Sequence, residues 1–409
     1  MYIKRKLEDK ILKYLETPEI IAVLGPRQCG KTTLLKKIFS GLKKAVFVSF
    51  EDKNVLNMFN RNIEDFVKLY VRGNRYLFID EFQYSKNGGK RLKYIFDSEK
   101  IKIFITGSSA IDLTIQATRY LVGRIFIFNL FPLDFSEFLS YKNVALNRIY
   151  SELNPGFLSK KNVTVGNEIK QKLAREFEEY SIFGGYPRVI LARDEAEKKE
   201  VLKNIYNTFF LREVRDVLGL IDDYKLGKLI KALAFQAGNL VEYRELSQIS
   251  EFTYPTLKKY LNFLEKTYIV GLVKPFYKNK RTEIVKNPKV YFFDSGLRNA
   301  IVNDFRKFED RNDMGQVLEN AVFSQLVKAG YDLNYWRNKR KSEVDFILNL
   351  ADGKKTALEV KNLLKNDQSK SIAEFERTYG GIEVILLFAS ISNNFQKSSG
   401  RKAFPVYFI

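Results

Sequence analysis

Three short, mostly apolar runs lie near the start of the chain, at residues 20–24, 75–81 and 101–106. Runs of this length indicate strands that are buried on both faces, as in a parallel sheet covered by helices. The apolar spacing of residues 34–39, shortly after the first run, predicts a helix. The first 140 residues are therefore expected to form an α/β domain with a parallel sheet.

Apolar residues at helical spacing continue through the middle of the chain. From residue 224 the pattern predicts a helix, then helices at residues 243–250 and 254–266, then strands at about residues 270–277 and 282–286. Three helices followed by a hairpin are the arrangement of a winged helix. Farther on, the pattern predicts an amphipathic helix at residues 318–326. The strands expected after it lie at residues 334–337, 343–348 and 357–361.

The chain has 409 residues, of which 45% are hydrophobic, enough for folded cores. It has no histidine and one cysteine, so Ser-His-Asp and Cys-His catalytic centres, His-ligated metals, structural zinc and intramolecular disulfides are excluded. No apolar stretch is long enough to span a membrane, and the basic first residues lack the apolar core of a secretory signal. We therefore expect a cytoplasmic protein with no membrane partner.

The first apolar run leads directly into a loop with the pattern G-x-x-x-x-G-K-T. The loop residues are Gly25, Pro26, Arg27, Gln28, Cys29, Gly30, Lys31, Thr32 and Thr33. Between a strand and a helix such a loop binds phosphate, because its backbone N–H groups surround the anion and the helix N-terminus adds its dipole. Lys31 is expected to contact the β- and γ-phosphates, and the Thr32 hydroxyl to ligate Mg²⁺. Cys29 occupies a variable position of the pattern, and we assign it no redox role.

Acidic and polar residues follow the other two predicted strands. Asp80 ends the second run, where it can hold Mg²⁺, and Glu81 beside it can polarise the attacking water as a general base. Ser108 follows the third run and could contact the γ-phosphate or the water. Downstream, Arg119 or Arg124 could act as an arginine finger, either in cis or from a neighbouring subunit of a homo-oligomer. The sequence has no Asn-Lys-x-Asp motif for reading guanine, so ATP is the expected nucleotide.

The formal net charge is +21 and is spread along the chain. Such an excess suits a polyanion such as DNA, and it equally fits a highly charged solvated surface. In the expected winged helix, residues of the third helix would meet a nucleic-acid groove and residues of the hairpin would contact phosphates. These candidates are Thr256, Lys258, Lys259, Lys278, Lys280 and Arg281. The alternative is a winged helix that packs between domains.

Near the C-terminus, Asp345 is followed by Glu359-x-Lys361. Because side chains alternate along a strand, Glu359 and Lys361 share one face, and adjacent strands would bring Asp345 to them. Two carboxylates can hold Mg²⁺, which lowers the pKa of a bound water, while the lysine orients that water or stabilises developing charge. This is the PD-(D/E)XK nuclease pattern, with Glu319 as a further acid and Val344 in place of the usual Pro. The alternative is a charged, solvated strand face.

The order of these motifs resembles a prokaryotic family of AAA-type P-loop ATPases with a winged helix and a C-terminal restriction-endonuclease-like domain of unknown function. The resemblance extends over nearly the whole chain. Besides the phosphate loop, it rests on residues 78–81, 106–109, 123–124, 184–187, 288–297, 318–320, 335–337, 343–345 and 359–361. It implies ATP binding and, less directly, work on nucleic acid, and it leaves open whether the nuclease-like domain is catalytic.

We therefore predict four parts: a P-loop ATPase domain at 1–140, a helical lid or linker at 141–223, a winged helix at 224–286 and a nuclease-like domain at 287–409. Two functions remain open. The first is a Mg²⁺-dependent ATPase that binds DNA and cleaves or remodels it. The second is an ATP-controlled switch or adaptor whose silent nuclease-like domain binds a protein or nucleic-acid partner. A third possibility, an ATPase on an anionic membrane, lacks an amphipathic anchor in the sequence.

Overall fold

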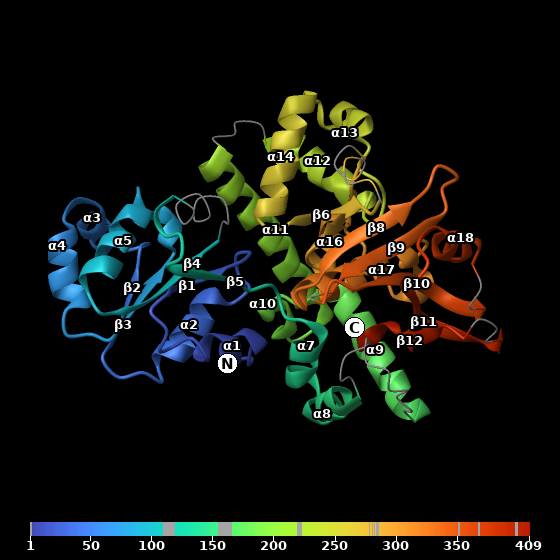
Figure 1. Cartoon of the computed structure of the whole chain (residues 1–409), viewed down its shortest axis with the longest axis horizontal. Coiled ribbons are helices and arrows are strands. Elements are labelled where there is room, and N and C mark those ends of the chain that lie inside the picture. The colour runs from blue at the N-terminus through green and yellow to red at the C-terminus, as the bar shows by residue number, and fades with distance from the viewer. Residues whose placement is uncertain are drawn as a thin grey trace. The chain divides into compact units, whose positions relative to one another are not determined.

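The computed structural model describes residues 2–108, 119–153, 166–218, 223–277, 279, 281, 283, 286–350, 352–366, 369–396 and 400–409. The chain divides into two compact units (Figure 1). One comprises Met1–Leu133 and Asn262–Ile269, and the other comprises Asp134–Leu261 and Val270–Ile409. No helix in these described ranges is long and apolar enough to cross a bilayer.

The first unit is built on a five-stranded sheet with the order β2-β3-β4-β1-β5, in which every neighbouring pair is parallel. Its strands are β1 (Ile20–Leu24), β2 (Ala45–Ser49), β3 (Tyr76–Asp80), β4 (Lys102–Gly107) and β5 (Ile125–Asn129). The parallel sheet expected from the three apolar runs is confirmed, and those runs are β1, β3 and β4. The carboxyl ends of all five strands lie at the same edge of the sheet.

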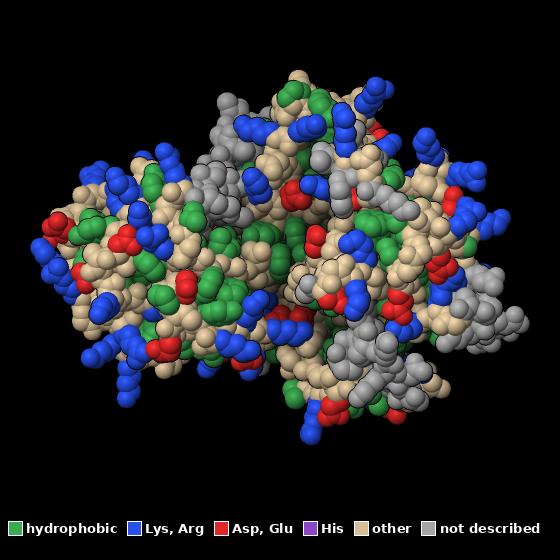
Figure 2. Space-filling model, viewed as in Figure 1, with side chains coloured by type: hydrophobic (Ala, Val, Ile, Leu, Met, Phe, Trp, Pro, Cys, Tyr) green, Lys and Arg blue, Asp and Glu red, His purple; other side chains and the backbone are tan. Residues whose placement is uncertain are grey.

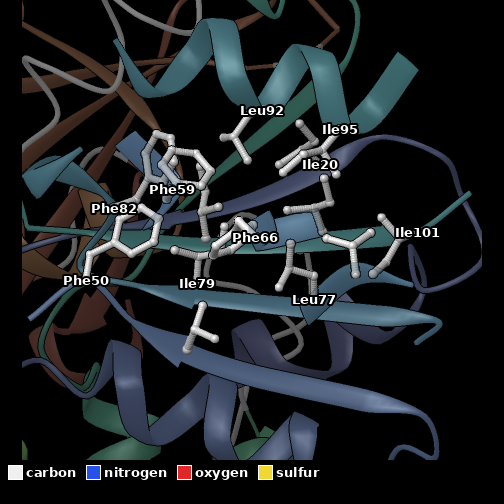
Figure 3. Close-up of a cluster of buried hydrophobic side chains, with 14 of the residues drawn as sticks. Ile20, Phe50, Phe59, Phe66, Leu77, Ile79, Phe82, Leu92, Ile95 and Ile101 are labelled. Atoms are coloured by element: carbon white, nitrogen blue, oxygen red, sulfur yellow. The ribbon is translucent and has the colours of Figure 1, made fainter. Parts of the chain in front are cut away.

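Helices bury both faces of this sheet. Alternate residues of β1 belong to two different cores, with Ile20, Ala22 and Leu24 in one and Ile21 and Val23 in the other. Figure 3 shows the first core, where residues such as Phe59, Phe66 and Leu92 pack near the strands. The helical elements are α1 (Lys6–Leu12), α2 (Lys31–Phe39), α3 (Lys53–Arg61), α4 (Ile63–Phe66), η1 (Val67–Val71), η2 (Phe82–Tyr84) and α5 (Gly88–Ser98). Because helices cover both faces of the sheet, polar functional side chains are expected at the ends of the strands.

The second unit combines helices with a mixed seven-stranded sheet of order β12-β11-β10-β9-β8-β6-β7. The strands are β6 (Val270–Pro275), β7 (Lys289–Phe292), β8 (Asp332–Arg337), β9 (Glu343–Asn349), β10 (Lys355–Asn366), β11 (Glu383–Gln396) and β12 (Lys402–Pro405). The helical elements that begin after residue 133 are α7 (Phe135–Lys142), α8 (Val144–Leu153), α9 (Asn167–Phe183), α10 (Pro187–Ile190), α11 (Glu195–Leu218), α12 (Asp223–Phe235), α13 (Tyr243–Ser250), α14 (Tyr254–Lys266), α16 (Ser295–Val302), η3 (Phe308–Asp310), α17 (Met314–Lys328), α18 (Lys370–Thr378) and η4 (Val406–Phe408).

The C-terminal part of this sheet has a definite topology. Strands β8, β9 and β10 pair antiparallel in sequence order, and β11 returns parallel to β10. Helix α17 precedes β8 and packs on β10, and α18 lies between β10 and β11 in the chain and packs on β9. A helix lies at residues 318–326 as expected, but it is not amphipathic. Residues 317–326 of α17 are buried apart from Glu319, because the helix is enclosed within the unit.

Two further expectations concern the segment around residue 286. Helices α13 and α14 have the predicted bounds, and the strand that pairs with β6 is β7. Of the strand expected at residues 282–286, residues 282, 284 and 285 lie outside the described structure. Residues 281 and 283 are helical. The boundary expected between residues 286 and 287 therefore falls between two strands of one sheet, and β6 also pairs with β8. The division into four domains is otherwise a prediction.

Gly184 and Gly185 lie in close contact with Asp294, the residue that directly precedes α16. Gly184 has φ +75°, and a Cβ on it would lie 2.0 Å from Oδ1 of Asp294. The buried Asp294 carboxylate accepts hydrogen bonds from the backbone N–H of Gly185 at 2.7 Å and of Leu297 at 3.0 Å. The segment 184–187, singled out in the sequence, therefore packs on the start of α16.

Replacing Gly184 with alanine is expected to destabilise the second unit. The left-handed backbone and the displaced Asp294 hydrogen bonds together predict a loss of about 2–4 kcal/mol in the free energy of unfolding. Gly353→Ala is the control, because its φ is +79° and, among described residues, nothing lies within 4 Å of a Cβ there. Unfolding in denaturant, followed by circular dichroism, measures the free energy of unfolding of both variants. Equal losses for both variants would contradict the packing explanation.

Candidate functional site

The phosphate loop joins the carboxyl end of β1 to α2, as the strand–loop–helix pattern predicts. Gly25 leaves no room for a side chain, since a Cβ would lie 1.9 Å from the Leu130 carbonyl oxygen. Gly30 has φ +97° and precedes the first residue of α2. The buried Lys31 ammonium donates to the carbonyl oxygens of Gly25 at 2.9 Å and Pro26 at 2.8 Å. The lysine is thus held inside its own loop, where it can meet a phosphate.

A buried arginine from far upstream supports this loop. Arg5 donates from Nη1 to the Cys29 carbonyl oxygen at 2.8 Å and from Nη2 to the Phe131 carbonyl oxygen at 2.6 Å. The Cys29 thiol is also buried, donates to the Leu130 carbonyl oxygen at 3.1 Å, and has a pKa raised by burial. Cys29 is therefore a packing residue in the described structure. Nothing in its local sequence could have revealed the role of Arg5, which lies 24 residues before its partner.

Asp80 at the end of β3 connects the phosphate loop to β4. Its carboxylate accepts the Thr32 hydroxyl at 3.0 and 2.9 Å and the Thr106 hydroxyl at 2.5 Å. The Thr106 oxygen in turn accepts the backbone N–H of Glu81 at 2.9 Å. Since β4 lies between β3 and β1, Thr106 ties together the ends of three neighbouring strands. The predicted residues Thr32 and Asp80 are therefore in direct contact.

Glu81 is half-buried and directly follows Asp80 in the chain. Its backbone is left-handed, with φ +56°, which turns the chain sharply after β3. Burial raises the pKa of the Glu81 carboxyl, an effect that Lys31 opposes and Asp80 increases. The Gln83 amide donates to the Glu81 carboxylate and also to the Ser108 hydroxyl at 3.3 Å. Gln83 was not predicted from the sequence, although its position two residues after the paired acids was a usable signal.

The residues at this edge fit a magnesium ion that accompanies a nucleotide. A threonine hydroxyl and a carboxylate in contact are hard oxygen ligands of the kind Mg²⁺ takes in phosphate-loop proteins. Thr32 and Asp80 would hold the ion. The phosphate loop also contains the predicted residues Arg27 and Gln28, and Thr33 lies in the first turn of α2. The backbone of Gln28 is left-handed, with φ +59°.

Arg124 does not lie at this site. It directly precedes β5, and its carbonyl oxygen accepts the Ile20 N–H at 2.8 Å, at the amino end of β1. The phosphate loop follows the opposite end of β1, so the five residues of that strand separate them by roughly 16 Å. The Arg124 side chain instead pairs with Asp97 at 3.1 Å. A finger role in cis is therefore wrong, and a role in a neighbouring subunit's site stays a prediction. Arg119 is exposed.

The candidate nucleic-acid residues are only partly within the described structure. On α14, Lys258 and Lys259 are exposed, whereas Leu257, Leu261 and Leu264 are buried as the pattern predicted. Thr256 is half-buried and Arg281 is exposed, while Lys278 and Lys280 lie outside the described residues. The Lys258 ammonium lies 4.6 Å from the ring centre of Tyr254. Figure 2 shows that lysines and arginines are spread over the visible surface with acidic residues between them.

Two of the carboxylates predicted for the C-terminal site, Glu319 and Asp345, lie beside a buried lysine. Lys289 on β7 has a side chain that is 2% exposed. Its Nζ lies 2.9 Å from Oε1 of Glu319, 2.5 Å from Oε1 of Glu343 and 3.9 Å from Oδ1 of Asp345. Asp345 also accepts the backbone N–H of Val360 on β10 at 2.8 Å. The cluster thus joins α17 to strands β7, β9 and β10.

Glu359 and Lys361 complete this group from β10. The Lys361 ammonium donates to Oε1 of Glu359 at 2.5 Å, and the buried Oε2 of Glu359 has no hydrogen-bond partner among the described residues. Burial raises the pKa of Asp345 well above its usual range, and the nearby Glu359 and Glu319 raise it further. Burial also raises the pKa of Glu359, against the effect of Lys361.

The pKa of Lys289 is raised in spite of its burial. Burial alone lowers the pKa of an ammonium group, but the surrounding Tyr291 and carboxylates outweigh it and raise the pKa of Lys289 well above the usual value. Tyr291 donates its hydroxyl to Glu319. Lys289 and Glu343 were not predicted from the sequence as members of the cluster. A lysine directly before the apolar run 290–293 was the available signal, since a charge in a buried strand needs a partner.

These residues do not fit a resident divalent metal. Among the described residues there is no group of three or more Asp, Glu, Cys or His side chains arranged to hold one. The carboxylate oxygens of Glu319 and Glu343 already contact the Lys289 ammonium. No metal-dependent step is therefore derived for this cluster.

Comparison with known proteins agrees with the geometry of the first unit. Residues 17–139 match a family described as an AAA domain. Residues 174–307 and 314–409 match two domains of unknown function, DUF8612 and DUF4143.

Proteins similar to this chain include two uncharacterized ones. One from Methanocaldococcus jannaschii is 27% identical over 387 residues, which cover 92% of this chain and 81% of that protein. One from Haemophilus influenzae is 27% identical over 367 residues, which cover 84% of this chain and 83% of the relative. The solved structure of a Walker-type ATPase of Pyrococcus abyssi aligns with 73% of this chain and 96% of its own, at 16% identity and a TM-score of 0.46. Residues 17–139 therefore match an AAA domain, and the phosphate loop and the acidic end of β3 lie within the matched segment.

Proposed function

We propose that this chain is a Mg²⁺-dependent ATP hydrolase that works as an ATP-controlled switch on nucleic acid. The observation that carries the hydrolase is the contact of the Thr32 hydroxyl with the Asp80 carboxylate, next to the half-buried Glu81. Thr32 and Asp80 would hold a metal–phosphate complex. The base Glu81 lies beside them, at the same edge of the sheet. The absence of a guanine-reading motif favours ATP.

Each part of the site has a defined task in this proposal. The backbone N–H groups of the loop and the N-terminus of α2 bind the phosphates, and Lys31 neutralises the charge that develops on them. Thr32 and Asp80 would hold Mg²⁺, which when bound would supply neutralisation of the phosphate charge. Glu81 orients the attacking water and accepts its proton, which requires the carboxylate form. Gln83 fixes the direction of the Glu81 side chain by donating to it, and the Ser108 hydroxyl accepts a second hydrogen bond from Gln83.

Two substitutions separate binding from hydrolysis. Lys31→Ala should abolish both tight ATP binding and turnover, since it removes the only lysine in the loop. Glu81→Gln should bind ATP normally yet hydrolyse it at least about 100-fold more slowly, because a general base contributes on this order. Nucleotide binding by calorimetry and phosphate release measure the two effects.

Lys37→Ala and Glu51→Gln are matched controls for these variants. Both side chains are exposed, Lys37 on α2 and Glu51 after β2, and both substitutions should leave turnover unchanged. Wild-type turnover in Glu81→Gln would show that another group is the base.

For nucleic acid, the proposed contact surface is the exposed face of α14. Helices α12, α13 and α14 are followed by the antiparallel pair β6–β7, and residue Leu240 bridges to Lys289 of β7. This order supports a winged helix, in which the third helix contacts a groove. Lys258 and Lys259 are exposed on that helix and suit phosphate contacts.

Removing both lysines tests this surface. The double variant Lys258→Ala/Lys259→Ala should bind duplex DNA more weakly, and the slope of log affinity against log salt should become shallower by about 1 for each DNA phosphate that a lysine no longer neutralises. The control Lys170→Ala/Lys172→Ala removes the same charge from the exposed side of α9. Fluorescence anisotropy over a salt series measures both. An equal loss in the two variants would mean that net charge alone governs binding.

We also propose that residues 314–409 have an endonuclease-like core that does not cut. The order α17, β8, β9, β10, α18, β11, with three antiparallel strands and a parallel return, supports that core. The lysine within the carboxylate cluster favours the switch over the nuclease among the two functions left open by the sequence.

A further inference from the structure

We infer that the ammonium group of Lys289 takes the place of a divalent cation in the carboxylate cluster of Glu319, Asp345 and Glu359, so that this cluster binds no metal. The inference rests on the endonuclease-like core proposed above and is independent of ATP hydrolysis. It assigns Lys289 as a resident cation that joins α17 to the sheet.

The Lys289 ammonium fills the space that a metal ion would need. Its Nζ lies 2.9 Å from Glu319, 2.5 Å from Glu343 and 3.9 Å from Asp345, and an ammonium has three hydrogen-bond donors. A hard divalent cation would need the same oxygens at about 2.0–2.6 Å. The ammonium and a metal cannot both occupy that space, so metal binding requires Lys289 to leave.

Burial and pairing hold Lys289 in this position. Its side chain is 2% exposed, and its Nζ lies 5.9 Å from the ring centre of Tyr335. In the sheet, Lys289 of β7 lies opposite Val273 of the neighbouring strand β6. An ammonium that moved away would leave the half-buried Glu319 and Asp345 without it, and breaking the ion pairs of a buried lysine in this way is destabilising.

The charges of the cluster are already close to balance. Four carboxylates contribute, from Glu319, Glu343, Asp345 and Glu359. Three described cations face them, since Lys289 contacts the first three, Lys361 contacts Glu359 at 2.5 Å, and Arg337 contacts Glu343 at 3.3 Å. With all four carboxylates ionised the balance is one negative charge, and protonation of Asp345, whose pKa is raised, brings it closer to zero. A further divalent cation would therefore leave an excess of positive charge around the buried Lys289, which is unfavourable.

Manganese binding to the full chain tests this directly. Free Mn²⁺ is followed by electron paramagnetic resonance without nucleotide, with Asp80→Asn present in every sample to silence the nucleotide site. The chain with native Lys289 and the variant that also carries Asp345→Asn should bind the same number of Mn²⁺ ions at millimolar concentration. One additional ion per chain that disappears with Asp345→Asn would overturn the inference.

A charge-matched variant tests whether the ammonium is what excludes the metal. Lys289→Met together with Glu343→Gln removes one charge of each sign and keeps Glu319, Asp345 and Glu359. This variant should gain one Mn²⁺ per chain, and adding Asp345→Asn should abolish the gain. A folded variant, judged by circular dichroism, that gains no ion would overturn the replacement of a metal by Lys289. If the variant fails to fold, the comparison of native Lys289 with Asp345→Asn decides alone.

Discussion

The nucleotide site depends on one carboxylate, that of Asp80, which accepts hydroxyl groups from a helix and from a neighbouring strand. Thr32 reaches it from the start of α2 and Thr106 from β4, and Thr106 also fixes the backbone N–H of Glu81. This is possible only because parallel strands place their carboxyl ends at one edge. Buried apolar residues cover both faces of the sheet, so they fix the strand order on which the contact depends.

The carboxylates of the two units have different kinds of partner. Asp80 accepts neutral hydroxyl groups, which leave its charge uncompensated and therefore attractive to a cation that arrives with a nucleotide. Glu319 and Asp345 instead have the fixed ammonium of Lys289 beside them. Burial of a charge costs free energy unless a partner compensates it, and a built-in partner removes the need for a metal. The same residue types thus form an exchangeable site in one unit and a permanent ion-pair cluster in the other.

The sequence could predict what depends on neighbouring residues. The apolar runs of β1, β3 and β4, the phosphate loop and the bounds of α13 and α14 were all readable from local patterns. The partners set by long-range packing were not, and Arg5 below the phosphate loop and Lys289 between Glu319 and Glu343 are the main examples. The topology also argues against Arg124 as an arginine finger within its own chain. Arg124 lies at the amino end of β5, and the phosphate loop lies at the opposite edge of the sheet. Helix α17 looked amphipathic because its polar residues, Asn320, Ser324 and Gln325, are buried through hydrogen bonds that no local pattern shows.

The most direct test of the central claim concerns Asp80. Phosphate release from ATP by the full chain should require Mg²⁺, stop when the ion is chelated, and fall at least about 100-fold in Asp80→Asn, since loss of metal assistance removes several kcal/mol of transition-state stabilisation. The asparagine preserves the size of the side chain and its ability to accept the Thr32 and Thr106 hydroxyl groups, so folding should survive. Hydrolysis by Asp80→Asn at the wild-type rate, with the same dependence on Mg²⁺, would contradict the assignment of this strand edge as the catalytic centre.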